Sequence, residues 1–442
     1  MAGEWLGCTI GELCDAGVVE LQTGPFGTQL HAHDYVEDGV PVVPTEAIRN
    51  RQIDHSVLPK ISPGKAEELA RHRLEPGDIL FARRGVQATG HIGCVREAED
   101  GFLCGTGAIR LRVRRAGSSV NPDFLSHVLA NPASVEWFKF HAIGATMPNL
   151  NEGIIRSFPL QIPPLPEQRA IAHILGTLDD KIELNRRMNE TLEAVARALF
   201  KSWFVDFDPV RAKAEGRDPG LPKSLADLFP DSFEDSELGE IPKGWEIGTL
   251  GDIADHSRRG VRPNDMEPAI PYIALEHMPR RCIALSDWGA ADGLESNKFK
   301  FKKGEILFGK LRPYFHKVGI APVDGVCSTD IVVVTPRTEE WFGFVLGHIS
   351  SDTFVEYTNA GSTGTRMPRT SWSEMARYRV VVPPESVTKA FTLQTRPAAD
   401  HIIASIHESR TLAALRDTLL PKLISGELRI DNAARFTAEA VA

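Results

Sequence analysis

The amino-acid sequence predicts an α+β fold in which two tandem, similar mixed α/β domains are separated by two long helices that form an antiparallel coiled coil. Three observations lead to this prediction. A series of landmarks occurs twice in the same order, and short β-rich runs bounded by Gly, Pro or Asp occur in both copies. A long helical segment follows each of two Pro-Pro pairs.

The internal repeat consists of short sequences that recur at a slowly changing offset. Residues 77–81 (GDILF) return as residues 304–308 (GEILF). The offset shrinks from 240 between Trp5 and Trp245 to 220 between the Pro-Pro pairs at 163–164 and 383–384, as loop trimming in the second copy would produce. The period is far longer than that of a solenoid or a propeller, so it indicates duplication of a half of roughly 220 residues.

The composition is that of an ordinary globular protein, with 42% hydrophobic and 25% charged residues over 442 positions. A chain of this length is expected to hold two or three domains. The first residues lack a basic region followed by an apolar run, and no long stretch is uninterruptedly apolar, so we expect a cytoplasmic protein. The six cysteines form no Cys-x2-Cys pair, which predicts reduced thiols rather than zinc ligands.

The formal net charge of −9 is concentrated in one segment of the chain. Residues 206–240 contain ten acidic and four basic side chains, and we expect this segment to be a surface connector. The two halves are therefore close to neutral and hold local basic clusters. For this reason the acidic total does not exclude a nucleic-acid ligand.

Within the first half, β-rich runs are expected at residues 40–43, 78–82, 91–95, 108–113 and 159–162. Asn121-Pro122-Asp123 is expected to begin a helix, with Asn as the cap and Pro in the first turn. In the second half, the expected strands are residues 306–308, 318–321 and 331–334. Arg110, Arg112 and Arg114 alternate with apolar residues and are expected to line an exposed strand face.

The first long helical segment extends from Pro166 to Phe200 and places apolar residues at six of eight heptad positions. These eight positions are Leu175, Leu178, Ile182, Asn185, Asn189, Leu192, Ala196 and Leu199. Asparagine at an inward position lowers stability but fixes the register, because an amide needs a matching amide across the seam. The alternative is that this helix packs only on its own domain, with both asparagines at the edge.

The second segment, from Ser386 to Ile424, has a looser apolar pattern that includes Ile402, Ile406, Leu412, Leu415 and Leu419. Pro397 is expected to break or kink this helix, and Gly426 is expected to end it. Packing the two helices against each other would bury both apolar stripes. A pair of helices of about 35 residues, on the order of 50 Å long, could then set the spacing of two DNA readers.

The usual catalytic and cofactor motifs are absent from the sequence, including the phosphate-binding loop, His-Glu-x-x-His and Gly-x-Ser-x-Gly. Residues 121–124 (NPDF) resemble the Asn-Pro-Pro-Phe/Tyr loop of amino-methyltransferases, but the second proline is missing and no methyl-donor loop is present. His31 and His33 lack an apparent third metal ligand. We therefore expect no catalytic residue, no metal and no cofactor.

Basic clusters on expected loops are the candidate functional residues. Two of them occupy equivalent places in the repeat, because Arg83-Arg84 and Lys310 with Arg312 each follow an Ile-Leu-Phe strand. A guanidinium can bond to O6 and N7 of guanine together, and an ammonium can neutralise a phosphate. The candidates for DNA contact are Arg83, Arg84, Arg258, Arg259, Lys310, Arg312, Arg366 and Arg369. The alternative for each is a solvated surface charge.

Five longer sequences resemble those of one known family, the specificity subunits of type I restriction-modification systems. They are residues 165–172 (LPEQRAIA), 178–189 (LDDKIELNRRMN), 200–209 (FKSWFVDFDP), 241–245 (IPKGW) and 419–428 (LLPKLISGEL). The resemblance covers essentially the whole chain. One departure is that the second helical segment begins Pro384-Glu385-Ser386-Val387 and lacks the Pro-Glu-Gln-Arg signature, so its docking surface is expected to be remodelled.

The resemblance implies two target recognition domains, each reading one half of a bipartite, asymmetric site in double-stranded DNA, and no catalysis by the chain itself. It also implies that the helices dock two modification (adenine methyltransferase) subunits, which restriction (translocase and nuclease) subunits join. The docking role then falls on residues 166–204 and on the segment ending at Leu428. The candidate coiled-coil and docking residues are Leu175, Leu178, Ile182, Asn185, Asn189, Leu192, Leu199, Ile402, Ile406, Leu412, Leu415 and Leu419.

The predicted organisation has six parts. These are recognition domain 1 (1–165), a central helix (166–204), an acidic connector (205–240), recognition domain 2 (241–385), a distal helix (386–430) and a C-terminal tail (431–442). Two other functions stay open from the sequence. One is a self-contained methyltransferase or nuclease fused to its reader, and the other is a protein scaffold that never touches DNA.

Overall fold

The structure is a computed structural model that describes residues 5–428 and 430, apart from 28, 115–117, 145 and 365. It divides into two compact units. Unit 1 comprises residues 1–180 and 413–442, and unit 2 comprises residues 181–412. Both boundaries fall inside long helices, α6 (Leu165–Phe204) and α13 (Glu385–Ile424). The predicted tail at 431–442 lies outside the described residues, and the six-part division stays a prediction.

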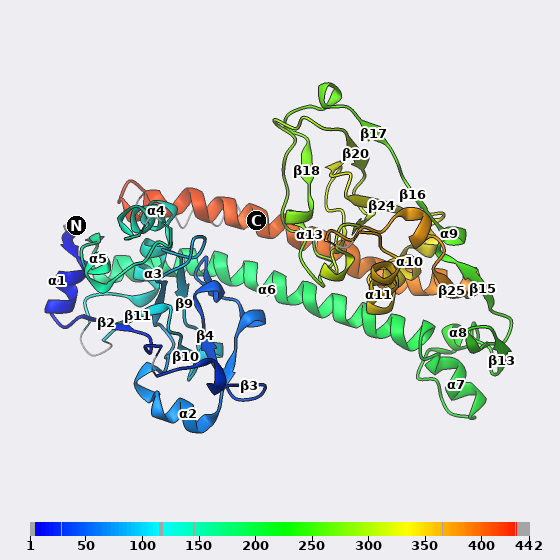
Figure 1. Ribbon diagram of the computed structural model, residues 1–442, viewed down its shortest axis with the longest axis horizontal. Helices are drawn as coiled ribbons and strands as arrows, with labels where there is room; N and C mark the ends of the chain where they lie inside the picture. The colour runs from blue at the N-terminus through cyan, green and yellow to red at the C-terminus, as the bar shows by residue number, and fades with distance from the viewer. Residues whose placement is uncertain are drawn as a thin grey trace. The chain divides into compact units, whose positions relative to one another are not determined.

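The main sheet of unit 1 has the strand order β2-β11-β8-β9, with every neighbouring pair antiparallel. Strands β2, β11 and β9 of this sheet are labelled in Figure 1. Its strands are β2 (Val19–Thr23), β11 (Ala108–Val113), β8 (Ile79–Ala82) and β9 (Ile92–Cys94). A second sheet has the order β10-β4-β7-β3, with β10 (Leu103–Cys104) parallel to β4 (Val40–Val43) and with β7 (Lys60–Ile61) and β3 (Tyr35–Val36) beyond. The strands expected from the sequence are confirmed to within a residue or two.

The remaining elements of unit 1 surround these sheets. Helix α3 (Pro122–Ala130) begins as expected, because the Asn121 side chain accepts the N–H of Phe124 at 2.9 Å. Strand β1 (Leu6–Thr9) pairs with β12 (Pro159–Ile162), which leads directly into α6. The other elements are α1 (Ile10–Asp15), β5 (Ile48–Arg49), β6 (Gln52–Ile53), α2 (Pro63–Glu68), α4 (Pro132–His141) and α5 (Glu152–Arg156).

Unit 2 is built on the same plan. Its main sheet has the order β16-β24-β21-β22, formed by β16 (Ala254–His256), β24 (Ile331–Pro336), β21 (Ile306–Gly309) and β22 (Val318–Ile320). Its second sheet has the order β17-β20-β23-β18-β19, formed by β17 (Gly260–Val261), β20 (Lys298–Phe301), β23 (Gly325–Cys327), β18 (Pro271–Ile273) and β19 (Gly289–Ala290). Strand β15 (Glu246–Thr249) pairs with β25 (Arg379–Val382), which leads into α13.

The duplication predicted from the sequence is confirmed by this topology. Each main sheet has the same strand order when corresponding strands are compared, and in each second sheet one pair is parallel, β10–β4 and β18–β23. Helix caps also correspond at the offset of 220. Asn131 and Ser351 cap α4 and α11 (Asp352–Ala360), and α3 corresponds to α10 (Phe342–Ile349). Two further short α-helices of unit 2 are α9 (Leu250–Ile253) and α12 (Trp372–Met375).

Within unit 2, α6 and α13 pack against each other in antiparallel fashion. Asn185 of α6 contacts Ser409 of α13, whereas Phe200, further along α6, contacts Phe391. The rings of Phe204 and Phe391 are 4.9 Å apart, so the helices share the apolar core of this unit. The predicted helix pairing is therefore confirmed here.

Both asparagines of the seam are buried rather than placed at its edge. However, Asn185 does not meet another amide. Its Nδ2 donates to Glu408 Oε2 at 2.7 Å and to Ser409 Oγ at 3.2 Å. The Oδ1 atom of Asn189 is buried without a hydrogen-bond partner in the described part of the chain. The expectation of amide pairing was thus wrong, because α13 presents a carboxylate and a hydroxyl at this level.

Pro397 does not break α13, which is helical without interruption from Glu385 to Ile424. The residue that loses its hydrogen bond is Leu393, four positions earlier, and both Leu393 and Pro397 are exposed. Water can therefore solvate the freed Leu393 carbonyl, while buried Phe391 and Ala399 hold the helix on the core. The end of the helix agrees with expectation, since Gly426 adopts a φ of 74°.

The acidic segment at 205–240 folds as part of unit 2. It contains α7 (Asp208–Ala214), α8 (Lys223–Ala226) and a hairpin of β13 (Phe233–Ser236) with β14 (Gly239–Pro242). Phe207, Val210 and Phe229 are buried, and Phe229 packs edge-on against Trp203 of α6 at 5.0 Å. The acidic side chains thus lie on a folded segment that contributes apolar residues to the core.

The arginines of β11 correct one expectation. Arg110 is buried and donates to the carbonyl of Arg73 at 3.1 Å. Arg112 makes two 2.7 Å hydrogen bonds with the carboxylate of buried Asp78. This face of the strand was expected to be exposed, but it satisfies carbonyls and a carboxylate of the segment that crosses it. Only Arg114 of the three is largely exposed.

Candidate nucleic-acid interface

The basic residues that follow β8 and β21 lie beside a loop that returns from later in the chain. In unit 1, the Leu150 N–H donates to the Arg83 carbonyl at 2.7 Å, and Ile143 and Asn149 exchange two hydrogen bonds. In unit 2, the Thr370 N–H donates to the Lys310 carbonyl at 3.0 Å, and Thr363 and Arg369 exchange two hydrogen bonds. Each unit therefore builds the same composite edge from a strand end and a short hairpin.

The two arginines of unit 1 have different surroundings. Arg83 is half-buried, and its Nε donates to Asn149 Oδ1 and to the Leu150 carbonyl, both at 3.1 Å. Its side chain therefore holds the hairpin in place. Arg84 is exposed, and its guanidinium has no hydrogen bond or ion pair with any described residue. Arg84 is thus the side chain of this pair that is available to a ligand.

Unit 2 presents a related but more aromatic edge. The Lys310 ammonium is half-buried and makes no ion pair among the described residues. Arg312 has a φ of 51°, in the left-handed region, and its guanidinium lies 5.9 Å from the centre of the Phe315 ring. Arg280 lies closer to the same ring, at 4.1 Å. Two guanidiniums and a ring therefore gather where unit 1 has only Arg83 and Arg84.

The remaining candidates are less uniform. Arg366 and Arg258 are exposed and make no hydrogen bond or ion pair within the described ranges. Arg369 lies 3.4 Å from the carboxylate of Asp330, and Arg259 forms an ion pair with Glu305. Arg366 and Arg369 belong to the hairpin next to Lys310, so the structure brings them together with the strand end. Among the described residues, no hydrogen bond or ion pair joins Arg258 or Arg259 to that hairpin.

Exposed apolar side chains accompany the basic residues at both edges. Met147 is 62% exposed and Met367 is 52% exposed, at corresponding positions of the two hairpins. In the loops after the strands, Val86 is 74% exposed and Tyr314 is 50% exposed. Sequence reasoning missed these residues as site candidates, although the recurring Met-Pro pair could have revealed them. An edge that combines cations with accessible apolar groups suits a ligand with charged and planar parts.

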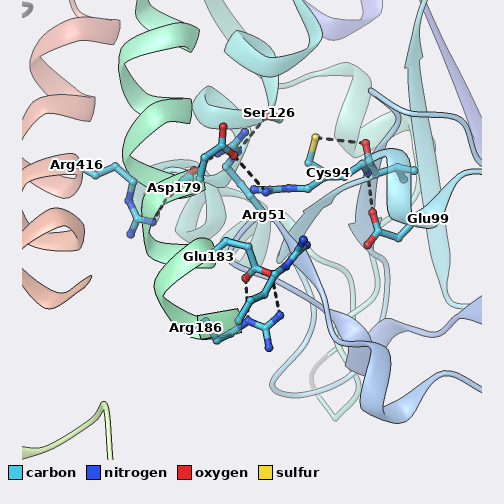
Figure 2. A network of polar contacts seen from close by, with 12 residues as sticks. Arg51, Cys94, Glu99, Ser126, Asp179, Glu183, Arg186 and Arg416 are labelled. Atoms are coloured by element: carbon cyan, nitrogen blue, oxygen red, sulfur yellow. Dashed lines mark hydrogen bonds and ion pairs between the residues drawn. The ribbon is translucent and has the colours of Figure 1, made fainter. Parts of the chain in front are cut away.

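A buried charge network attaches the first recognition domain to both long helices within unit 1. Figure 2 shows Asp179 of α6 between the guanidinium groups of Arg51 and Arg416. Arg416 Nη1 donates to Asp179 Oδ1 at 2.7 Å, and Arg51 Nε donates to Ser126 Oγ at 3.0 Å. Arg51 adopts a φ of 60°, so a left-handed turn aims its side chain at the helices. No sequence motif predicted this network.

His127 lies in the same region and is almost fully buried. Burial, with the nearby guanidiniums of Arg51 and Arg416 as the next cause, lowers the pKa of His127 well below its ordinary value. The imidazole is therefore neutral at neutral pH.

Comparisons with known proteins connect this geometry to one family. A family model for the type I restriction modification DNA specificity domain matches residues 4–194. The type I restriction enzyme MjaIX specificity subunit of Methanocaldococcus jannaschii is 28% identical over 321 residues, which is 70% of each chain. The HindI specificity subunit of Haemophilus influenzae is 24% identical over 447 residues, covering 88% of this chain and 94% of that one.

These comparisons confirm the resemblance to the specificity subunits of type I restriction-modification systems. The crystal structure of the type I restriction-modification S subunit from M. genitalium has the same fold. Its TM-score is 0.57 at 15% identity, over 95% of this chain and 96% of that one. The family match ends at residue 194 although unit 2 repeats the topology of unit 1.

The predicted coiled-coil residues differ in their burial. Leu175, Leu178, Asn185, Asn189, Ile402, Ile406, Leu412 and Leu419 are buried, whereas Ile182, Leu192, Leu199 and Leu415 are half-buried. Their assignment to the coiled-coil seam and to subunit docking stays a prediction. A different set of apolar side chains on α6 is exposed, namely Leu184, Met188 and Val195.

These three residues form a stripe, because positions separated by four and seven residues share one side of a helix. We call Leu184, Met188 and Val195 the exposed α6 stripe. No pattern in the sequence had identified this surface. None of the described helices is long and apolar enough to cross a membrane.

Proposed function

We propose that this chain is the non-catalytic DNA sequence-recognition subunit of a type I restriction-modification complex. It reads a bipartite, asymmetric site in double-stranded DNA, one half with each unit. The observation that carries this proposal is the duplicated edge, in which a strand end and a hairpin present free cations and exposed apolar side chains. The names of the relatives, all specificity subunits, support the same role.

The chemistry of each edge suits base reading. The free guanidinium of Arg84 can donate two parallel hydrogen bonds to a guanine edge, and Met147 and Val86 offer apolar contact to a thymine methyl group. In unit 2, Arg366 and Lys310 supply the charges, and Tyr314 supplies an exposed ring. Because the side chains differ while the backbone plan is the same, the two half-sites are expected to differ in sequence.

The long helices serve as the spacer and the docking platform in this proposal. A helix of 40 residues, the length of both α6 and α13, is on the order of 60 Å long. The exposed α6 stripe is proposed to receive a modification (adenine methyltransferase) subunit, since its apolar side chains are 42–57% exposed in the described part of the chain. Two such subunits, joined by restriction (translocase and nuclease) subunits, complete the proposed complex and supply its chemistry.

The proposal is tested by expressing the chain with and without modification subunits and mapping adenine methylation of the host DNA. The expected result is a split, asymmetric methylated motif that appears only when both proteins are present. Methyl transfer by the purified chain alone would instead establish a self-contained enzyme. DNA binding that is absent, or insensitive to salt, in both states would establish a scaffold.

A further inference from the structure

Unit 2 contains an open cavity of about 260 Å³ between α6, α10 and α13. Its floor is apolar and is formed by Leu192, Ala196, Phe200, Leu346, Phe391 and Ile402, among others. Arg197, Lys201, Arg281 and Asp352 contribute exposed polar side chains at its margin, and the buried polar residues Glu193, His316 and Thr395 also line it. An open cavity with a largely apolar lining and a few polar groups is a candidate binding site.

The corresponding place in unit 1 is filled by the buried charge network. Arg51 corresponds to Arg281, because both have a positive φ (60° and 53°) and both donate their N–H at 2.9 Å, Arg51 to the Ile92 carbonyl of β9 and Arg281 to the His316 carbonyl just before β22. The offset of 220 relates Asp179 to Ala399 and Ser126 to Leu346. Ala399 and Leu346 both line the cavity of unit 2. The acid at the centre of the network is therefore an alanine in the second copy.

The partner on the facing helix is shortened in the same way. In unit 1, Arg416 faces Asp179 across the helix pair. In unit 2, Ala196, at the same offset of 220 from Arg416, lines the cavity together with Ala399. His127, buried in unit 1, corresponds to Gly347, and a Cβ at Gly347 would lie 2.1 Å from the Phe200 ring. Three large polar side chains are thus replaced by two alanines and a glycine.

With its acid absent, Arg281 turns outward. It pairs with Asp352 at 2.6 Å, and both side chains are largely exposed at the margin of the cavity. What remains inside is a largely apolar surface whose atoms are incompletely packed in the free chain. An apolar group that enters the cavity gains dispersion contacts with this surface.

The margin indicates what accompanies that apolar group. Arg197, Lys201 and Arg281 each carry a largely exposed cation, and each is paired with one acid, namely Glu193, Asp206 and Asp352 respectively. The exposed N–H groups of these cations can still donate to a carboxylate that an occupant carries close to its apolar part. The cavity also adjoins the exposed α6 stripe, because Leu192 lies one turn from Met188 and Val195 on either side.

We infer that this cavity is a socket for one aromatic or branched apolar side chain of a modification subunit, presented next to a carboxylate of that subunit. The inference rests on the proposed function and specifies one of its docking contacts. It further implies that the two halves differ as docking surfaces, because unit 1 fills the equivalent place with Arg51, Asp179 and Arg416. One of two identical partners therefore gains an anchor that the other lacks.

Ala399→Leu tests the inference by filling the socket, and Ala404→Leu is the matched control, since Ala404 is an exposed residue of the same helix. Binding of the modification subunit to the full-length chain is measured by titration calorimetry. We expect Ala399→Leu to weaken one of two binding steps by at least about tenfold, as loss of an anchor side chain does, and to leave the other step unchanged. Ala404→Leu is expected to bind like the original chain.

A second variant and a second measurement guard against misfolding of Ala399→Leu. The double variant Ala196→Arg/Ala399→Asp rebuilds the charge pair of unit 1 in the socket and is expected to weaken the same step. On the unaltered chain, the methyl resonances of Ile283 and Ile402, which line the socket, should shift when the modification subunit is added. Those of Ile79 and Ile109 in the core of unit 1 should not.

The outcomes separate the two proposals. If the unaltered chain binds no modification subunit, the proposed function fails. If it binds, but both socket variants bind equally well and the Ile283 and Ile402 signals stay in place, the socket is refuted and the proposed function stands.

Discussion

Replacing Asp179 by Ala is expected to loosen unit 1 strongly, because Asp179 is the one acid between two guanidiniums. Asp179 is 7% exposed, and the side chain of its partner Arg51 is 10% exposed. Removing one member of a buried ion pair leaves a charge without compensation, which typically costs about 3–5 kcal/mol. Arg416 is less deeply buried and also pairs with Asp417 at 2.7 Å, so it can remain partly compensated. We therefore expect a loss of about 3 kcal/mol, at the lower end of that range.

The neighbouring Asp180 provides the control, since it is an acid on the same helix that undergoes the same change to Ala. Its side chain is 74% exposed and lies 3.4 Å from Arg96. An exposed pair of this kind contributes about 0–1 kcal/mol. Any gain in helix propensity from Asp to Ala is shared by both variants and cancels in the comparison.

The assay is native-state hydrogen exchange of the full-length chain, because two units need not unfold as one cooperative system. Opening free energies of β8 and β11 amides report on unit 1 directly. A loss of about 3 kcal/mol accelerates their exchange on the order of a hundredfold. An Asp179→Ala effect within about 1 kcal/mol of Asp180→Ala would refute the claim that the network holds the domain to the helices.

A triple variant separates the charge from the packing. Arg51→Met, Asp179→Leu and Arg416→Met together replace the network by apolar side chains of comparable size. Such replacements of buried ion pairs are often neutral or stabilising. We expect the triple variant to recover most of the stability that Asp179→Ala loses. Recovery of none of it would show that the network acts through its geometry rather than by compensating buried charge.

The remaining predictions concern DNA reading, pH and the helices. Arg84→Ala and Arg312→Ala are each expected to cost about 1–3 kcal/mol in DNA binding and to relax only one half-site, whereas an equal loss on every sequence would indicate phosphate contact. The unfolding free energy should decrease as pH falls below about 6.5, because the unfolded chain then binds a proton that buried His127 excludes. The contribution of His127 to this decrease is up to about 1.4 kcal/mol per pH unit. His127→Asn should therefore flatten the dependence of the unfolding free energy on pH. Pro397→Ala restores the donor to the exposed Leu393 carbonyl and should raise the thermal midpoint, and a lowered midpoint would contradict the account of that helix. Deleting one heptad from α6 and the facing heptad from α13 should change the gap between half-sites without changing either half, and an unchanged gap would refute the spacer.

The sequence predicted the elements well because their signals are local. The strands after Gly77-Asp78 and Gly304-Glu305, the Asn121 cap and the stop at Gly426 each depend on a few neighbouring residues and on backbone geometry. The prediction that Pro397 breaks the helix was wrong because it used a rule for local sequence without knowing which side of the helix is exposed to solvent. The prediction that the β11 arginines are exposed was wrong for a similar reason. Alternation shows that side chains share one face of a strand, but it does not show what covers that face.

The candidate site was predicted only in part. The equivalence of Arg83-Arg84 and Lys310 followed from the repeat. The different roles of Arg83, which holds the hairpin, and Arg84, whose side chain is free, did not follow, because they depend on Asn149, 66 residues away from Arg83. The Arg51–Asp179 pair spans 128 residues and has no motif at either end. Contacts of this range depend on packing that no periodicity encodes.

Duplication supplies a test that one copy alone could not offer. Where both copies keep the same backbone contact, as at Leu150 with Arg83 and Thr370 with Lys310, the contact builds the fold, since the side chains around it differ. Where the backbone corresponds but the charges do not, as at Asp179 and Ala399, the difference cannot be required by the fold, because the fold persists without them. By the same reasoning, the left-handed turns at Arg51 and Arg281 belong to the shared architecture, because both copies have them. Asp179, which pairs with Arg51 but has no counterpart for Arg281, belongs to the separate tasks of the two halves.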